Sequence, residues 1–354
     1  MEMRDSLAEV GEYSLHHRIA RCLNAQIGAD VVGDDAAVVA LEEHQRWSLL
    51  VSTDRLAAGV PPQLRAKLLV AQTLSDVICM GGTPLGLLVA VQWPRSSSVA
   101  DSVEFIQAVE QDAVRYGCHL IGGDTKEGKE FAAVGTAVAI ADPDKIVRRT
   151  PAADKDLVVV TSAGARPWGA RWAYQLVTHY DLQLAGGLRE QLATSDLEIT
   201  LPFAETPALV GPKLVRAGLD LSDGIGASLR IMSEANHLGF NVIPEALDEL
   251  IDPATVPVTD ALGLPLRALA LSPGYMWENM YTVRDRELSR ATRAVEAVGG
   301  KLTVIGEASD RFNGVLYGGR ESEVIDGASD EKFRQFAWED RVSHWVQTMR
   351  TAEL

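Results

Sequence analysis

Cysteine is scarce in this sequence. The 354 residues contain three cysteines, Cys22, Cys79 and Cys118, and no two of them stand close together in the chain. An odd number of widely spaced cysteines offers neither a disulfide framework nor a cysteine-rich zinc site. Isolated thiols of this kind are typical of a reducing compartment, so we expect a cytoplasmic protein.

Positive charge is also in short supply. Lys and Arg number 33 against 49 Asp and Glu, which leaves a net charge of -16. Binding to nucleic acid or to an anionic membrane without sequence preference needs clustered Lys and Arg, so we expect neither partner. An acidic protein can still bind a nucleotide when metal ions and backbone amides receive the phosphates.

Long apolar segments are absent as well. Residues 1–5 lead into polar sequence and no apolar segment of the secretory type follows them, so no signal peptide is predicted. The uncharged stretch 77–93 carries the turn residues Gly81-Gly82-Thr83-Pro84 in its middle. The turn divides the stretch into a helix end and a strand, and each part is too short to span a bilayer.

Several common catalytic motifs are missing. The sequence contains no G-x-x-x-x-G-K-[ST] phosphate loop and no kinase-type H-R-D segment, which sets the common ATP-binding folds aside. It has no G-x-S-x-G nucleophile elbow, and its seven histidines form no H-E-x-x-H or other zinc-ligand spacing. Any chemistry must therefore come from other residue types.

The length and the apolar pattern predict two domains with mixed α and β structure. With 47% hydrophobic residues the chain can form two cores, and turn residues at Ala141-Asp142-Pro143-Asp144 place the boundary between domains 1–142 and 143–354. In the first domain we predict helices over 13–23, 64–80 and 99–116 and strands over 36–41, 47–52, 85–92 and 132–140. In the second we predict a strand at 157–161, helices over 169–178, 207–217 and 224–238, and a further apolar run at 301–305.

The most informative feature is a set of aspartates that stand beside Gly, Ser or Thr at predicted strand ends or helix starts. The five segments are Gly33-Asp34-Asp35-Ala36-Ala37, Ser52-Thr53-Asp54, Leu74-Ser75-Asp76, Gly122-Gly123-Asp124-Thr125 and Asp220-Leu221-Ser222-Asp223-Gly224. Each segment alone is explained as well by a helix cap or a turn. Together they would repel one another in one cleft unless cations neutralised them, and Mg²⁺ prefers carboxylate oxygens, water and substrate phosphates. The set therefore predicts a metal site that receives phosphate.

Two glycine segments support a phosphate ligand. At Gly122 and Gly123 the missing side chains would let the backbone approach a ligand closely, with a tight turn as the alternative explanation. Gly224 precedes a predicted helix whose first amides could face an anion. Outside this set, Trp168 and Trp172 are predicted to be core residues.

Taken in order, these segments resemble the motifs of the thiamine-monophosphate kinase family, within the superfamily of aminoimidazole ribonucleotide synthetase and selenophosphate synthetase. The resemblance covers most of the chain. The matching segments are Gly11-Glu12-Tyr13, Gly33-Asp34-Asp35-Ala36-Ala37-Val38, Ser52-Thr53-Asp54 with Gly59-Val60, Leu74-Ser75-Asp76 with Met80-Gly81-Gly82-Thr83-Pro84, Gly122-Gly123-Asp124-Thr125 and Asp220-Leu221-Ser222-Asp223-Gly224.

The resemblance implies a two-domain α+β fold of the aminoimidazole ribonucleotide synthetase type. In this fold a mixed-sheet N-terminal domain pairs with its copy in a homodimer, and an α/β C-terminal domain completes the cleft. The implied activity is an ATP- and Mg²⁺-dependent transfer of the γ-phosphoryl group to thiamine phosphate or a related small molecule. Transfer of this kind depends mainly on positioning and charge neutralisation.

The resemblance also implies roles for single residues. Two or more Mg²⁺ ions would be held by Asp35, Asp54, Asp76, Asp124 and Asp223. The nucleotide would be bound by Thr53, Gly122, Gly123, Asp124, Thr125, Ser222 and Asp223. Catalysis would depend on Asp124, Asp220 and Asp223.

One segment departs from the family pattern. Where the family has G-G-E-D-Y-E-L, this chain has Pro273-Gly274-Tyr275-Met276-Trp277-Glu278-Asn279. By resemblance Tyr275, Trp277 and Glu278 would line the acceptor pocket, while an acidic pair of the family is replaced. A changed acceptor is therefore an alternative, in which the same nucleotide site phosphorylates or activates a different metabolite as the synthetase relatives do. A non-catalytic binding protein is a third reading, which the intact aspartates disfavour.

Overall fold

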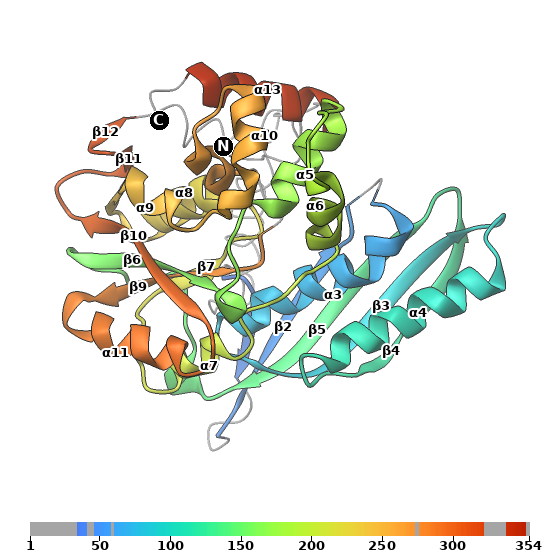
Figure 1. The fold of residues 1–354 in the computed structure, drawn as a ribbon. Helices are drawn as coiled ribbons and strands as arrows, with labels where there is room; N and C mark the ends of the chain where they lie inside the picture. Colours follow the sequence, from blue (N-terminus) through green and yellow to red (C-terminus); the bar gives the residue numbers. More distant parts are fainter. Residues whose placement is uncertain (1–33, 41–45, 58–59, 273–275, 322–337, 352–354) are drawn as a thin grey trace, which may run out of the picture.

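The computed structural model describes residues 34–40, 46–57, 60–272, 276–321 and 338–351, and these form two β-sheets with helices packed against them (Figure 1). The α+β class is confirmed. The first sheet and its helices comprise Ala37–Ala40 (β1), Ser48–Arg55 (β2), Pro62–Cys79 (α3), Thr83–Pro94 (β3), Val99–Val114 (α4), Leu120–Gly128 (β4) and Ala132–Ala141 (β5). The helix predicted over 13–23 lies outside the described residues.

The first sheet has the strand order β1-β2-β5-β3-β4. β3 and β4 run parallel and the other neighbours are antiparallel, so the sheet is mixed. Side chains alternate across it: in β5 every second residue, such as Ala133 and Ala137, is buried. Both α3 and α4 supply residues to the same core, including Leu69, Leu74 and Val109. The helices therefore cover one face of the sheet.

The second part of the chain builds a seven-stranded sheet with the order β12-β11-β8-β10-β6-β9-β7. Its strands are Asp156–Ser162 (β6), Gly218–Asp220 (β7), Gly239–Val242 (β8), Asn279–Arg284 (β9), Lys301–Ser309 (β10), Gly314–Tyr317 (β11) and Arg320–Glu321 (β12). Its helices are Ala170–His179 (α5), Leu188–Asp196 (α6), Glu205–Val210 (α7), Ile225–Asn236 (α8), Pro244–Asp248 (α9), Val256–Leu262 (α10), Asp285–Glu296 (α11) and Trp338–Thr351 (α13). Short 3-10 turns occupy Pro143–Lys145, Ala163–Ala165, Pro253–Thr255 and Leu266–Leu271.

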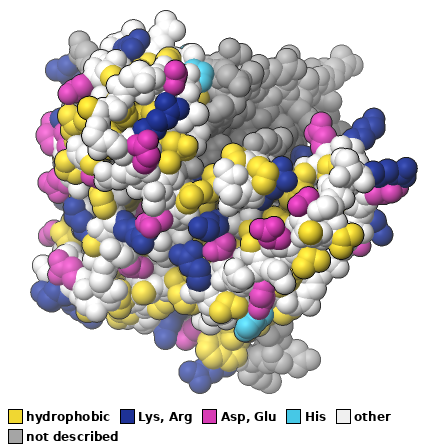
Figure 2. Space-filling model, turned by 45° about the vertical axis from the view of Figure 1, so that its right-hand side comes forward, with side chains coloured by type: hydrophobic (Ala, Val, Ile, Leu, Met, Phe, Trp, Pro, Cys, Tyr) yellow, Lys and Arg dark blue, Asp and Glu magenta, His cyan; other side chains and the backbone are white. Residues whose placement is uncertain are grey.

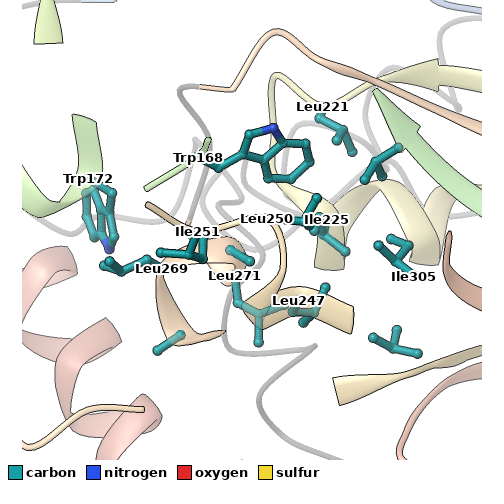
Figure 3. Packing of buried hydrophobic residues seen from close by; sticks show 14 of the residues in the cluster. Trp168, Trp172, Leu221, Ile225, Leu247, Leu250, Ile251, Leu269, Leu271 and Ile305 are labelled. Carbon is teal, nitrogen blue, oxygen red and sulfur yellow. The ribbon is translucent and has the colours of Figure 1, made fainter. Parts of the chain in front are cut away.

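The core of the second part combines tryptophan side chains with many aliphatic ones (Figure 3). Trp168 and Trp172 are 6% and 3% exposed and belong to one apolar cluster, so their prediction as core residues is confirmed. The ring of Trp345 in α13 meets Trp172 edge-on at 5.1 Å, and its indole nitrogen donates a hydrogen bond to the carbonyl of Leu271. These contacts hold α13 against α5 and the 3-10 turn Leu266–Leu271. Among the described helices, none combines the length and apolar character needed to cross a membrane.

The end of α3 is the point where the two sheets meet. α3 packs against β7, and the Tyr281 hydroxyl on β9 donates a hydrogen bond of 2.8 Å to the carbonyl of Cys79, the last residue of α3. The amide of Val147 donates to the carbonyl of Met80 at 3.0 Å. The final turn of α3 is thus held by residues from the second half of the chain.

Most predicted elements are present, but several differ in detail. The helix expected over 207–217 is α7, which ends at Val210 because Gly211 follows and Lys213 adopts a left-handed conformation with φ 56°. The strand expected to end at 52 continues through Asp54 to Arg55. The proposed boundary at 142/143 falls between β5 and β6, and it stays a prediction.

Gly122-Gly123-Asp124-Thr125 forms neither a turn nor a strand end. The segment lies within β4, at the edge of the first sheet. A Cβ atom on Gly123 would come within 1.9 Å of the carbonyl oxygen of Val89. Because Gly123 has no side chain, β3 can pack closely against β4 at this position. The sequence alone did not reveal this structural role.

Candidate functional site

Buried and half-buried carboxylates gather where α3 meets β7. Asp76 lies in the last turn of α3, and Asp220 is the last residue of β7. The hydroxyl of Ser75 donates a hydrogen bond of 2.5 Å to Oδ2 of Asp220, which ties the helix to the strand. Sequence reasoning placed Asp76 at a strand end or helix start, whereas the structure places it at a helix end.

Asp76 is surrounded by other acids. Burial raises its pKa well above the ordinary value, and the charges of Asp220, Asp54 and Asp35 raise it further. The Ser52 hydroxyl donates to Oδ2 of Asp76 and opposes this shift by stabilising the ionised form. The structure therefore brings together acids from four of the five aspartate segments.

Asp220 completes this group. Burial raises its pKa to about 7, helped by the charges of Asp35 and Asp223 and opposed by hydrogen bonds from Ser75 and Ser222. The Ser222 hydroxyl donates to Oδ1 of Asp220 at 2.9 Å. We refer to Asp35, Asp54, Asp76, Asp220 and Asp223 as the carboxylate cluster.

Two consecutive arginines meet the two consecutive aspartates of the first motif. Arg148 Nη1 donates to Asp34 Oδ2 at 2.7 Å, and the Arg149 guanidinium pairs with Asp35, with Nε 3.1 Å from Oδ1. The Cys79 thiol also donates to Asp35, at 3.1 Å. Sequence reasoning assigned neither Arg148 nor Arg149 to the site. Two adjacent arginines matching two adjacent aspartates were the sequence feature from which this pairing could have been predicted.

The donor set of the cluster fits a hard divalent cation. It consists of buried carboxylates that repel one another, and Mg²⁺ takes such oxygens as ligands. Within the part of the chain that the structure describes, no three acidic, histidine or cysteine residues converge as a ready-made metal shell. An incomplete protein shell is typical of Mg²⁺ sites, because Mg²⁺ usually binds one or two carboxylates and completes its coordination with water and phosphate.

The structure separates Thr53 from the cluster. Because side chains alternate along β2, buried Ser52 and half-buried Asp54 share one face and Thr53 is exposed on the other. The Thr53 hydroxyl lies 2.8 Å from that of Thr136, its cross-strand neighbour in β5. Thr53 therefore lies on the face of the sheet that α3 and α4 leave open.

Asp124 is also apart from the cluster within one chain. Its carboxylate is 62% exposed on β4 and lies 3.7 Å from the Lys126 ammonium. It is not among the main charges that raise the pKa of Asp76 or Asp220. The roles expected for Asp124, Gly122, Gly123 and Thr125 stay predictions. Gly224 does precede a helix, α8, as expected, and its φ of 85° suits glycine.

A pocket of about 330 Å³ lies beside Trp277 and Glu278 in the second half of the chain. It is lined by Arg166, Pro167, Trp168, Arg171, Met276 and Trp277, among others. The Arg171 guanidinium lies over the Trp277 indole, 5.5 Å from the ring centre, and Trp277 itself is 8% exposed. Tyr275, which was also predicted to line such a pocket, lies outside the described residues.

Glu278 is half-buried at the wall of this pocket, and both of its carboxyl oxygens accept hydrogen bonds. The Thr161 hydroxyl donates to Oε2 at 2.6 Å and the Ala163 amide to Oε1 at 2.8 Å. Burial nevertheless raises the pKa of Glu278 to about 8, and the charge of Glu205 adds to the shift. At neutral pH Glu278 is therefore mostly uncharged.

Strand pairing connects the pocket to the carboxylate cluster. The amide of Leu221 donates to the carbonyl of Glu278 at 2.8 Å, and Asp220 of β7 pairs with Asn279 of β9. Asp220 of the cluster and Glu278 at the pocket are therefore joined through the pairing of β7 with β9 and the residues next to it. On the face shown in Figure 2, acidic and basic side chains are interspersed and no continuous basic area is visible.

Comparison with known proteins agrees with this arrangement. Residues 33–141 match the family model of the AIR synthase related protein, N-terminal domain. The chain is 29% identical over 252 residues to the thiamine-monophosphate kinase of Synechococcus elongatus, covering 66% of this chain and 72% of that one. It is 27% identical over 324 residues to the thiamine-monophosphate kinase of Escherichia coli K12, covering 87% and 93% of the two chains.

A solved structure has the same fold. AaThiL complexed with AMPPCP and TMP superposes with a TM-score of 0.74 at 20% identity, over 90% of this chain and 97% of that chain. At this level of identity the likeness concerns the fold. It extends over both sheets described above.

Proposed function

Because the chain is similar to thiamine-monophosphate kinases over most of its length, we propose that it is an ATP-dependent kinase that phosphorylates thiamine phosphate or a related small molecule. The observation that carries the proposal is the buried carboxylate cluster, joined by the pairing of β7 and β9 to a pocket of small-molecule size. A cation-binding cluster beside a pocket is the arrangement that phosphoryl transfer requires.

The proposed reaction moves the γ-phosphoryl group in one step. A phosphate oxygen of the acceptor forms the new bond to the γ-phosphorus while the bond to the bridging oxygen of ADP breaks. Mg²⁺, when bound, neutralises the phosphate charge and aligns the reacting groups. The protein's own task is to hold the two substrates in line.

The carboxylate cluster would hold the metal ions. Asp35, Asp54, Asp76 and Asp223 are its proposed ligands, and the Ser52 hydroxyl keeps Asp76 oriented. Asp220, with a pKa of about 7, can hold or release a proton at neutral pH. The assignment of Thr53, Gly122, Gly123, Asp124 and Thr125 to the nucleotide rests on the family motifs alone.

The pocket beside Trp277 is the proposed acceptor site. Trp277 and Trp168 border the cavity with apolar edges, while Arg166 and Arg171 bring positive charge to it. Arg166 already pairs with Glu198 at 2.7 Å. A planar ring system that carries a phosphate matches these properties.

The open face of the first sheet favours pairing with a second copy. Leu88 and Ile121 on β3 and β4 are 37% and 58% exposed, and Val39 on β1 is 41% exposed. Val138 and Ile140 of β5 lie half-buried on this same face. Apolar side chains spread over one sheet face are typical of a protein–protein contact, so we propose a homodimer through this face.

The proposal is tested by product analysis. Purified protein is incubated with ATP, Mg²⁺ and thiamine monophosphate, and the products are followed by phosphorus NMR and mass spectrometry. We expect thiamine diphosphate and ADP in equal amounts. The Asp76→Asn variant should lose turnover by at least about a hundredfold, while the matched control Asp112→Asn in α4, whose side chain is 13% exposed and pairs with Arg115, should keep it.

Two other outcomes would contradict parts of the proposal. If ATP binds in a Mg²⁺-dependent manner but thiamine monophosphate is not consumed, the acceptor is a different metabolite. The changed acceptor would then be attributed to the segment 273–279, which departs from the family pattern. If ATP does not bind at all, the protein is not a kinase. A full rate for Asp76→Asn would exclude Asp76 as a metal ligand.

A further inference from the structure

Asp35 and Arg149 form an ion pair inside the carboxylate cluster. The Asp35 side chain is 4% exposed and that of Arg149 is 20% exposed. The Asp35 charge raises the pKa of both Asp76 and Asp220, so Asp35 lies close to the other acids. A carboxylate this deeply buried needs a cation beside it, and Arg149 supplies one.

The neighbouring pair has the same composition but a different setting. Arg148 and Asp34 are 40% and 17% exposed and lie 2.7 Å apart. Asp34 is not among the main charges that raise the pKa of Asp76 or Asp220. The Asp35–Arg149 pair therefore contacts the carboxylate cluster, whereas the more exposed Asp34–Arg148 pair does not.

The main chain of Arg149 is fixed on both sides. Its amide donates to Asp34 Oδ1 at 3.1 Å, and its carbonyl accepts a hydrogen bond of 2.9 Å from Asn236 Nδ2. Asn236 Oδ1 in turn accepts from the Ala152 amide at 2.6 Å. The long side chain of Arg149 can therefore change partner by rotating about its own bonds while the backbone stays in place.

We propose that Arg149 is an exchangeable counter-cation: it neutralises Asp35 when no divalent cation is bound, and gives up this carboxylate when a divalent cation takes it as a ligand. The released guanidinium then faces the phosphates of the nucleotide, a part of the inference that rests on the proposed function. Guanidinium groups bind phosphate oxygens through paired hydrogen bonds, which suits Arg149 to both roles. Arg149 is thus a positioning residue that couples metal binding to phosphate binding.

The exchange predicts effects of opposite sign in one variant. In Arg149→Gln the divalent cation no longer competes with a guanidinium, so Mn²⁺ should bind the nucleotide-free protein about tenfold more tightly. The same variant should bind ATP in the presence of Mg²⁺ about tenfold more weakly, because the phosphates lose a partner. Mn²⁺ binding is measured by electron paramagnetic resonance and ATP binding by calorimetry.

Arg148→Gln is the matched control, since it removes the same side chain from the neighbouring Asp–Arg pair and should change neither affinity. In an Asp35→Asn background, Arg149→Gln should no longer alter Mn²⁺ binding, because the contested carboxylate is gone. Arg149→Lys keeps the charge and should leave Mn²⁺ affinity near that of the wild type, which covers the case in which Arg149→Gln does not fold.

Unchanged or weaker Mn²⁺ binding in Arg149→Gln, with the variant folded, would overturn the proposal. Tighter Mn²⁺ binding with unchanged ATP affinity would also overturn it, because the guanidinium would then never move to phosphate. Mn²⁺ binding to the free protein does not depend on thiamine phosphate being the acceptor. A failure of the proposed kinase activity therefore leaves this readout intact.

Discussion

At the scale of single residues, burial decides the charge of the acids in this protein. Glu278 and Asp220 have pKa values of about 8 and about 7, in both cases chiefly because burial penalises the ionised form. Their hydrogen bonds from Thr161, Ala163, Ser75 and Ser222 only reduce these shifts. The two halves of the proposed site thus contain carboxyl groups that can carry protons at neutral pH.

The protonated state of Glu278 predicts a pH-dependent stability. Folding raises its pKa from the ordinary 4.5 to about 8, so between these values the folded chain holds a proton that the unfolded chain releases. Rising pH therefore favours the unfolded state over this range, and the contribution to the free energy of unfolding falls by about 1 kcal/mol per pH unit.

Glu278→Gln removes this contribution and preserves the shape of the side chain. Urea unfolding of wild type and variant, from about pH 5 to about pH 8, should show a difference between their free energies of unfolding that shifts in favour of the variant as pH rises. All other titrating groups cancel in this difference. Parallel curves would mean that Glu278 is ionised in the folded protein.

At the scale of elements, the two-residue period of the strands distributes the predicted site residues between two faces. Ser52 and Asp54 face the helices and the carboxylate cluster, while Thr53 between them faces away. In β4, Gly123 is needed for strand packing, because a side chain there would clash with the Val89 carbonyl of β3. A motif of adjacent residues is therefore not a set of adjacent side chains.

The close approach at β4 predicts different costs for two neighbouring glycines. A Cβ on Gly123 would lie 1.9 Å from the Val89 carbonyl oxygen, whereas one on Gly122 would lie 3.4 Å from the Leu88 side chain, an ordinary contact. Gly123→Ala should lower the free energy of unfolding by about 1–3 kcal/mol more than Gly122→Ala.

The two substitutions share almost the same backbone conformation, with φ of 158° and 159°, so their difference isolates the contact with β3. Chemical unfolding of both variants measures it. Equal stabilities would show that β4 can move away from β3 at little cost, and the steric reason for Gly123 would then be wrong.

At the scale of the whole molecule, two sheets meet at the end of α3 and one sheet face stays uncovered (Figure 1). The carboxylate cluster lies at this meeting point, where Ser75 of α3 donates to Asp220 of β7. The open face lies on the opposite side of the first sheet and carries Leu88, Val138 and Ile140. The carboxylate cluster and the proposed interface are thus separated by the thickness of one sheet.

If the homodimer forms through the open face of the first sheet, a substitution on that face should disrupt it. Leu88→Glu places a charge among its apolar side chains and should shift the protein from dimer to monomer, measured by size-exclusion chromatography with light scattering. Val103→Glu on α4, which is 50% exposed on the helix-covered side, is the matched control and should leave the dimer intact. A monomeric wild type, or a Leu88→Glu variant that stays dimeric, would contradict the proposed interface.

The sequence by itself determined which elements form and which acids matter. Helical and strand periods are local properties, so α3, α4, β3 and β5 were predictable from neighbours a few residues apart. The acid-rich segments around Asp35, Asp54, Asp76 and Asp220 were recognisable for the same reason, since each motif is a short run of residues.

Only the tertiary structure decided how these residues are arranged against one another. The pairing of Arg149 with Asp35 joins positions 114 residues apart, and the bond from Tyr281 to the end of α3 joins positions 202 apart. The exposure of Asp124 and the outward direction of Thr53 depend on which strand neighbours which and which face the helices cover. Such contacts arise from the packing of distant segments, and no local pattern in the chain encodes them.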